Sequence, residues 1–128
     1  MSIEFSLQPK GDYLRFEVSG TRVKGEFGTE MLKVWERVAN ECRANRFRRV
    51  LGISKVTGPV PRVELYDVAA KAPPMLRRAG CRKVAYVVLG GDEARRAIQF
   101  SEHVAASHLP ITHVFADEAS AIAWLMEP

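Results

Sequence analysis

The chain has 128 residues, of which 47% are hydrophobic and 27% are charged, and its formal net charge is +4. A chain of this length buries roughly two thirds of the surface that its unfolded form exposes, so one domain can form a core without disulfides or metal. No apolar run approaches the roughly 18 to 20 residues of a membrane span, and the N-terminus lacks the layout of a secretory signal. We therefore expect a cytoplasmic protein with a single domain over residues 1–128.

The first elements form a hairpin followed by a helix. Residues 3–7 and 13–18 are rich in β-branched and aromatic side chains and flank a stretch of turn formers, which predicts two antiparallel strands. From Thr29 onward, Met31, Trp35, Val38 and Cys42 recur at helical spacing. We expect Thr29 to be the N-cap of this helix, with the last turn near residues 44–45.

A short apolar run over residues 49–57 predicts a central strand that is covered on both faces. It leads into a proline-stiffened loop over residues 58–61 and then into a second helix, which we expect Pro73-Pro74 to stop. A last turn over residues 75–78 reaches Gly80.

Residues 83–89 predict another covered strand, and Gly90-Gly91 then turns the chain into a third helix capped by Asp92. Pro110 ends that segment, residues 111–115 predict a strand, and Asp117 caps a closing helix. The order β-β-α-β-α-β-α-β-α indicates an α/β fold. We expect a single mixed β-sheet, an N-terminal antiparallel hairpin followed by parallel strands, with about four helices packed on it.

Several of these segments resemble a known family. The central strand ending in Ser54-Lys55-Val56-Thr57 and the C-terminal sequence VFADEASAIAWL at residues 114–125 resemble the stand-alone relatives of stage II sporulation protein AA, in the STAS superfamily of sulphate-transporter and anti-sigma-factor-antagonist domains. The resemblance implies a STAS-like fold and a regulatory, non-enzymatic role. In that superfamily a serine or threonine at the start of the helix after the central strand is the phosphorylation switch, whereas the matching loop here, residues 58–62, has no hydroxyl group.

Stand-alone relatives of this kind also resemble lipid carriers, which hold a cleft between the sheet and their helices. By that resemblance, Leu65, Tyr66 and Met75 beside Pro73-Pro74 would line a cleft. The alternative is that these residues belong to the core and to a connection.

No motif for catalysis, cofactor or metal binding survives inspection. Gly90-Gly91-Asp92-Glu93 matches a motif of cyclic-dinucleotide cyclases, but here it joins a strand to a helix as a tight turn. His103, His108 and His113 lack the spacing and the further ligands of a metal site. Cys42 and Cys81 form no CxxC motif, so we expect two reduced thiols.

Basic residues are predicted to gather where the parallel strands begin. If these strands are parallel, one edge of the sheet collects Arg43, Arg46, Arg48, Arg49, Arg77, Arg78, Arg82 and Lys83. One interpretation is a surface for anionic lipid. The other is that cations at helix C-termini complement the helix dipoles, at about 0.3 to 1 kcal/mol each. No nucleic-acid partner is expected, because the cluster lacks interleaved exposed aromatic residues.

We therefore expect a non-enzymatic binding or regulatory module that docks a protein partner or a small apolar ligand at the carboxyl edge of the sheet. The candidate binding residues are Ser54, Thr57, Gly58, Pro59, Pro61, Arg62, Tyr66, Gly90, Gly91 and Asp92. The alternative is a peripheral membrane protein that uses Arg46, Arg48, Arg49, Arg77 and Arg78. A hydrolase dependent on Asp92 or His103 is a third option, and the sequence leaves a homodimer open.

Overall fold

The computed structural model describes residues 2–89, 91–105 and 109–128, without the side chains of residues 101–105. Within these residues the elements follow the predicted order: β1 (Ile3–Pro9), β2 (Leu14–Thr21), α1 (Phe27–Asn45), β3 (Arg49–Thr57), α2 (Arg62–Arg78), β4 (Lys83–Val88), α3 (Asp92–Ala105), β5 (Ile111–Phe115) and α4 (Glu118–Leu125).

The strands form one five-stranded sheet in the order β1-β2-β3-β4-β5. Strand β1 is antiparallel to β2, whereas β2, β3, β4 and β5 all run parallel to one another. Arg49, Lys83 and Ile111, the first residues of three strands, lie side by side in register. The prediction of a mixed sheet with β3 at its centre is confirmed.

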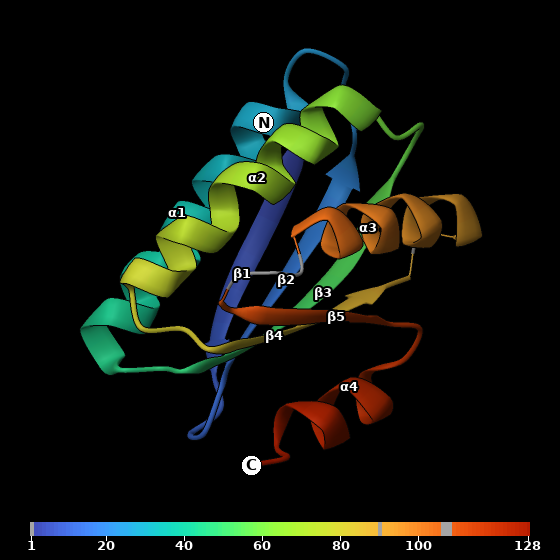
Figure 1. Cartoon of the computed structure of the whole chain (residues 1–128). Helices are drawn as coiled ribbons and strands as arrows, with labels where there is room; N and C mark the ends of the chain where they lie inside the picture. The colour runs from blue at the N-terminus through green and yellow to red at the C-terminus, as the bar shows by residue number, and fades with distance from the viewer. Residues whose placement is uncertain (1, 90, 106–108) are drawn as a thin grey trace.

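Helices cover both faces of the sheet. Figure 1 shows α1, α2 and α3 on one face and α4 on the other. Because side chains alternate along a strand, Val50 of β3 points to the larger core under α1 to α3, while Leu51 and Ile53 point to the smaller core under α4. Arg15 on β2 ties α4 to the sheet, since its Nε donates to Glu118 Oε2 over 2.9 Å.

Three aromatic rings form the centre of the larger core. The Phe16 and Trp35 rings meet edge to face with their centroids 5.0 Å apart, and the Tyr86 ring lies 5.9 Å from Trp35. Gly52 on β3 makes room for them, because a Cβ there would lie 2.6 Å from Phe16 Cζ and 2.6 Å from Tyr86 Cδ1. The rings therefore lie directly over the central strand.

Helix α2 contradicts one prediction. We expected Pro73-Pro74 to stop it, but the helix continues through both prolines to Arg78. A proline inside a helix costs about 3 kcal/mol, because it removes a hydrogen bond and crowds the preceding turn. Burial of Leu76 beyond the prolines, in line with Ala72 before them, contributes favourable free energy against this cost.

The start of α1 contradicts another prediction. The helix begins at Phe27, ahead of Thr29, and the preceding residue makes no side-chain capping bond. The carboxylate of Glu64 on α2 takes that role: its Oε2 accepts from Gly25 N over 2.9 Å and its Oε1 accepts from Gly28 N over 3.0 Å. At the other end of the chain, Asp117 caps α4 as predicted, by accepting from Ser120 N over 2.8 Å.

These backbone hydrogen bonds hold the pKa of Glu64 below its ordinary value. A carboxyl group whose pKa is lower in the folded state stabilises the fold above its unfolded pKa, and this contribution is lost as the pH falls through the folded value. We therefore expect Glu64→Gln to lower the thermal midpoint at pH 7, and the difference from the wild type to shrink below about pH 4. Thermal unfolding of both proteins at pH 7 and below about pH 4 measures this difference. Glu36→Gln, on the exposed side of α1, is the control, and an equal deficit at both pH values would contradict the capping role.

Candidate functional site: a cavity between the sheet and three helices

A cavity of about 120 Å³ lies between the sheet and α1, α2 and α3. Most of its surface is apolar, and the strands β3, β4 and β5 form its floor. The lining residues are Arg22, Phe27, Met31, Trp35, Ser54, Val56, Leu65, Val68, Ala69, Ala72, Pro73, Leu76, Val84, Tyr86, Ile98, Pro110, Thr112 and Val114.

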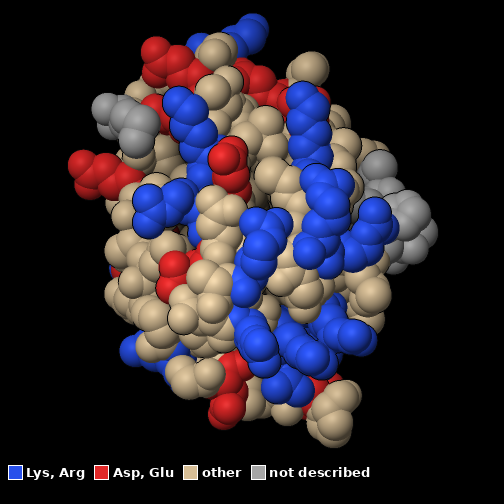
Figure 2. Space-filling model, turned by 90° about the vertical axis from the view of Figure 1, so that its left-hand side faces the viewer, with Lys and Arg blue, Asp and Glu red and all other residues tan. Residues whose placement is uncertain are grey.

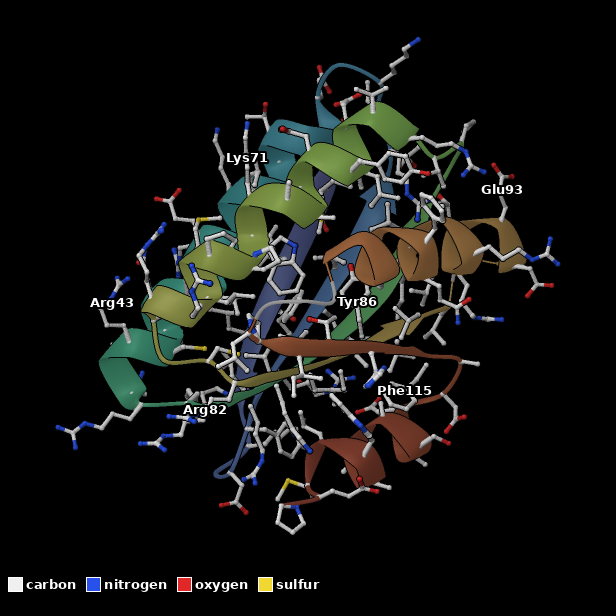
Figure 3. All side chains as sticks on the ribbon, in the orientation of Figure 1. Arg43, Lys71, Arg82, Tyr86, Glu93 and Phe115 are labelled. Carbon is white, nitrogen blue, oxygen red and sulfur yellow. The ribbon has the colours of Figure 1, made fainter. Side chains whose placement is uncertain are left out.

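The sequence of α2 explains why this space stays open. Ala69, Ala72 and Pro73 face the cavity with short side chains, so α2 covers the sheet without filling the volume beneath it. On the opposite wall, Trp35 and Tyr86 are fixed by their ring contacts. Figure 3 shows Tyr86 on the sheet, on the side covered by α2 and α3. Aromatic rings of α1 and β4 therefore line one side of the cavity, and small residues of α2 line the other.

Few polar side chains line this apolar space: Arg22, Ser54, Tyr86 and Thr112. Arg22 directly follows β2, and its backbone N donates to Thr57 O over 2.9 Å. Its side chain is only 7% exposed, and its Nη1 donates to Gly58 O over 2.8 Å. Burial lowers the pKa of this guanidinium from its ordinary value.

Ser54 and Tyr86 form a second polar group on the cavity floor. Ser54 is 2% exposed and hydrogen-bonds the Tyr86 phenol. Burial raises the pKa of Tyr86, against the smaller opposing effects of that hydrogen bond and of the Arg22 charge. The phenol is therefore neutral at physiological pH and available as a hydrogen-bonding group.

The predicted binding residues divide between the cavity and the rim above it. Ser54 lies inside, and the Gly58 carbonyl holds Arg22. Thr57 is exposed and its hydroxyl donates to Gly20 O over 3.2 Å. A hydrogen bond from Leu89 N to Ser54 O joins the ends of β3 and β4. Pro59, Arg62, Gly91 and Asp92 are exposed on the surrounding loops and helix starts, Pro61 is half-buried, and Gly90 lies outside the described residues.

The predicted cleft residues on α2 also divide. Leu65 and Pro73 line the cavity. Met75 and Tyr66 are not among the lining residues and pack at the edge of the core, where the Tyr66 ring lies 5.7 Å from Phe100 of α3. This ring contact joins α2 to α3.

The basic residues gather at the edge where β3, β4 and β5 begin, as the register requires. Figure 2 shows Lys and Arg side chains collected on that side of the molecule. In Figure 3, Arg43 and Arg82 lie towards this end and Glu93 towards the other. Lys83 is directed to α4, since its Nζ donates to Trp124 O and Glu127 O over 3.2 and 3.0 Å.

The remaining candidates show no reactive cluster. Cys42 and Cys81 are buried and their thiols hydrogen-bond one another; this contact and burial raise the pKa of Cys81. The side chains of His103 and His108 lie outside the described residues, and the His113 ring packs against Trp124. Over the described part of the chain, no group of three His, Cys, Asp or Glu side chains could hold a metal. In the same part, no helix is long and apolar enough to cross a bilayer.

Sequence reasoning missed Arg22, and it assigned Trp35 to packing alone. One signal was present for Arg22. The buried residues Leu14, Phe16 and Val18 alternate along β2, and continuing that period by two residues beyond Gly20 reaches Arg22. The alternation therefore places this arginine on the covered face of the sheet.

Among solved structures, the chain is similar to the crystal structure of an uncharacterized protein from the DUF3478 family with a SpoIIAA-like fold, from Shewanella loihica PV-4. The TM-score is 0.52 at 16% sequence identity, and the match covers 97% of this chain and 94% of that one. No protein-family model and no curated protein matches the sequence. The similarity confirms the SpoIIAA-like fold that the sequence resemblance implied.

Proposed function

We propose that this chain is a binding module that holds a small, largely apolar molecule in the cavity beneath α1, α2 and α3. The observation that carries the proposal is the cavity itself, an apolar space with a few convergent polar groups, which is the usual character of a small-molecule site. An enclosed apolar cavity of about 150 Å³ is known to hold benzene, and this space of about 120 Å³ is partly open, so it suits the apolar part of a small ligand that extends towards the opening.

The same lining supports binding without catalysis. Among the lining residues that the structure describes, none is a histidine, cysteine, lysine, aspartate or glutamate, so none of them is a general base for the Ser54 hydroxyl. Tyr86, its hydrogen-bonding neighbour, has a raised pKa and cannot take its proton at neutral pH. Ser54 is better suited to orienting a ligand than to attacking one.

Two consecutive alanines of α2 test the proposal. Ala69 lines the cavity, whereas Ala70 is exposed on the same helix. A phenylalanine at position 69 would occupy the space that a ligand needs. With octan-1-ol as the uncharged probe, we expect Ala69→Phe to weaken binding by about tenfold or more, and Ala70→Phe to leave it unchanged. Titration calorimetry measures both.

Two results would overturn the cavity as the site. The first is wild-type protein that binds none of the alcohols from hexan-1-ol to decan-1-ol. The second is octan-1-ol that binds equally well to both variants, because the probe would then lie elsewhere. Thermal unfolding of each variant shows that the fold is retained before the comparison is made.

A second candidate is docking of the basic edge on an anionic membrane. Six exposed arginines of this edge form no ion pair within the described part of the chain: Arg43, Arg46, Arg48, Arg77, Arg78 and Arg82. The wild-type protein should then float with phosphatidylglycerol vesicles at low salt and less so at high salt. The double variant Arg77→Glu/Arg78→Glu should float less than the wild type, whereas Arg62→Glu, at the opposite edge, should float as the wild type does. If the protein does not float at low salt, membrane docking is contradicted, and the arginines serve to complement the dipoles of the helices that end at this edge.

A further inference from the structure

The Arg22 guanidinium is a buried charge that borders the cavity. It is 7% exposed, and its Cζ lies 5.9 Å from the centre of the Phe27 ring, another lining residue. A guanidinium has five N–H donors, and one hydrogen bond, from Nη1 to the Gly58 carbonyl, fixes its position. The backbone bond from Arg22 N to Thr57 O holds the base of the side chain at the end of β3.

No carboxylate neutralises this charge in the part of the chain that the structure describes. The ion pairs there involve Arg15, Lys55, Lys71 and Arg95, and none involves Arg22. The charge of Glu93 acts on Arg22 from a distance, but the two form no ion pair and Glu93 is exposed. A buried charge is costly unless it is paired, so an uncompensated arginine beside a cavity indicates an anionic ligand group.

We propose that Arg22 binds the carboxylate of a small amphipathic acid whose apolar body fills the cavity. The inference rests on the proposed function and adds the chemical class of the ligand. A guanidinium matches a carboxylate through two parallel N–H···O bonds, which gives both affinity and orientation.

The remaining polar groups of the cavity agree with a carboxylate better than with a more highly charged group. Arg22 is the only Lys or Arg among the lining residues within the described part of the chain, so it balances one negative charge. Ser54, Tyr86 and Thr112 add neutral hydroxyl groups. A phosphate monoester carries a charge of roughly −1.5 to −2 at neutral pH and would remain partly uncompensated.

Matched probes that differ only in the charged group test the inference. Octanoate and octan-1-ol have the same chain length, so a difference in their affinities reports the carboxylate. We expect the wild type to bind octanoate about 10- to 100-fold more tightly than octan-1-ol, as a hydrogen-bonded charge pair implies. In Arg22→Gln this preference should vanish, so that octanoate and octan-1-ol bind with about equal affinity. Octyl phosphate, as a third probe, should bind less tightly than octanoate.

Two control variants separate the possible outcomes. Arg22→Lys keeps the positive charge and should retain part of the octanoate preference, even where Arg22→Gln is unstable. Arg37→Gln removes an exposed arginine of α1 outside the site and should change nothing. If octan-1-ol binds and octanoate binds no better, the carboxylate inference fails while the proposed cavity site stands. If neither probe binds the wild type, the proposed function itself fails.

Discussion

Trp35→Ala is expected to lower the free energy of unfolding by about 3 to 5 kcal/mol, the range found when a core tryptophan is truncated. Trp35 is buried on α1 and joins that helix to the sheet through its edge-to-face contact with Phe16 and its contact with Tyr86. The alanine variant loses both ring contacts and enlarges the existing cavity, which neighbouring side chains cannot easily refill.

Trp124→Ala is the matched control, because it removes the same side chain from the opposite face of the sheet. Trp124 is only half-buried and packs against Phe115 and His113, so we expect a loss of about 1 to 2 kcal/mol. Urea unfolding followed by circular dichroism gives both values. A Trp35→Ala variant no less stable than Trp124→Ala would show that α1 is not held to the sheet by this cluster.

Gly52→Ala is the second large effect, with an expected loss of about 1 to 3 kcal/mol from overpacking. The added methyl group would lie 2.6 Å from Phe16 Cζ and from Tyr86 Cδ1, closer than such atoms can approach. Both rings belong to the packed cluster, so neither can turn aside without moving its neighbours. The midpoint of urea unfolding should therefore fall.

A double-mutant cycle shows whether the clash is the cause. Phe16→Leu removes the ring atoms Cζ and Cε1 that the new methyl group would meet. The combined variant should therefore lose less stability than the two single variants added together, by about 0.5 kcal/mol or more. Additive losses would show that the contact with the Phe16 ring is not the cause of the loss.

The sheet and its order were predictable because their signals are local. The apolar run of β3 at residues 49–57 appears with the bounds that the sequence predicts. The helical spacing of Met31, Trp35, Val38 and Cys42 likewise identifies the buried face of α1. These patterns reflect the periods of a strand and a helix, which require no knowledge of distant residues.

Helix ends were harder to predict, because distant groups determine them. Thr29 is a residue type that favours the N-cap, yet Glu64 on another helix binds the Gly28 amide in the first turn of α1 instead. Pro73 and Pro74 disfavour a helix interior, yet the packing of α2 between α1 and α3 carries the helix past them. In both cases tertiary contact outweighs the preference of the residue itself.

The family resemblance implied a cleft between the sheet and the helices, but the polar lining of the cavity could not be derived from the sequence, because it is formed between elements. The small residues of α2 have the pattern of an ordinary buried stripe, and Arg22 lies beyond the strand predicted over residues 13–18. Only the fold brings Arg22, Ser54 and Tyr86 to one apolar space. The chemistry of the site therefore depends on residues whose individual patterns carry no functional signature.

The two tryptophans provide the most direct test of ligand binding in the cavity. Trp35 lines it, whereas Trp124 lies on the opposite face of the sheet. Their indole N–H signals in a ¹H–¹⁵N correlation spectrum, assigned with Trp124→Phe, can be followed during titration with octan-1-ol. We predict a saturable shift of the Trp35 signal with the Trp124 signal unmoved. A stationary Trp35 signal, or equal movement of both signals, would contradict binding beneath α1, α2 and α3.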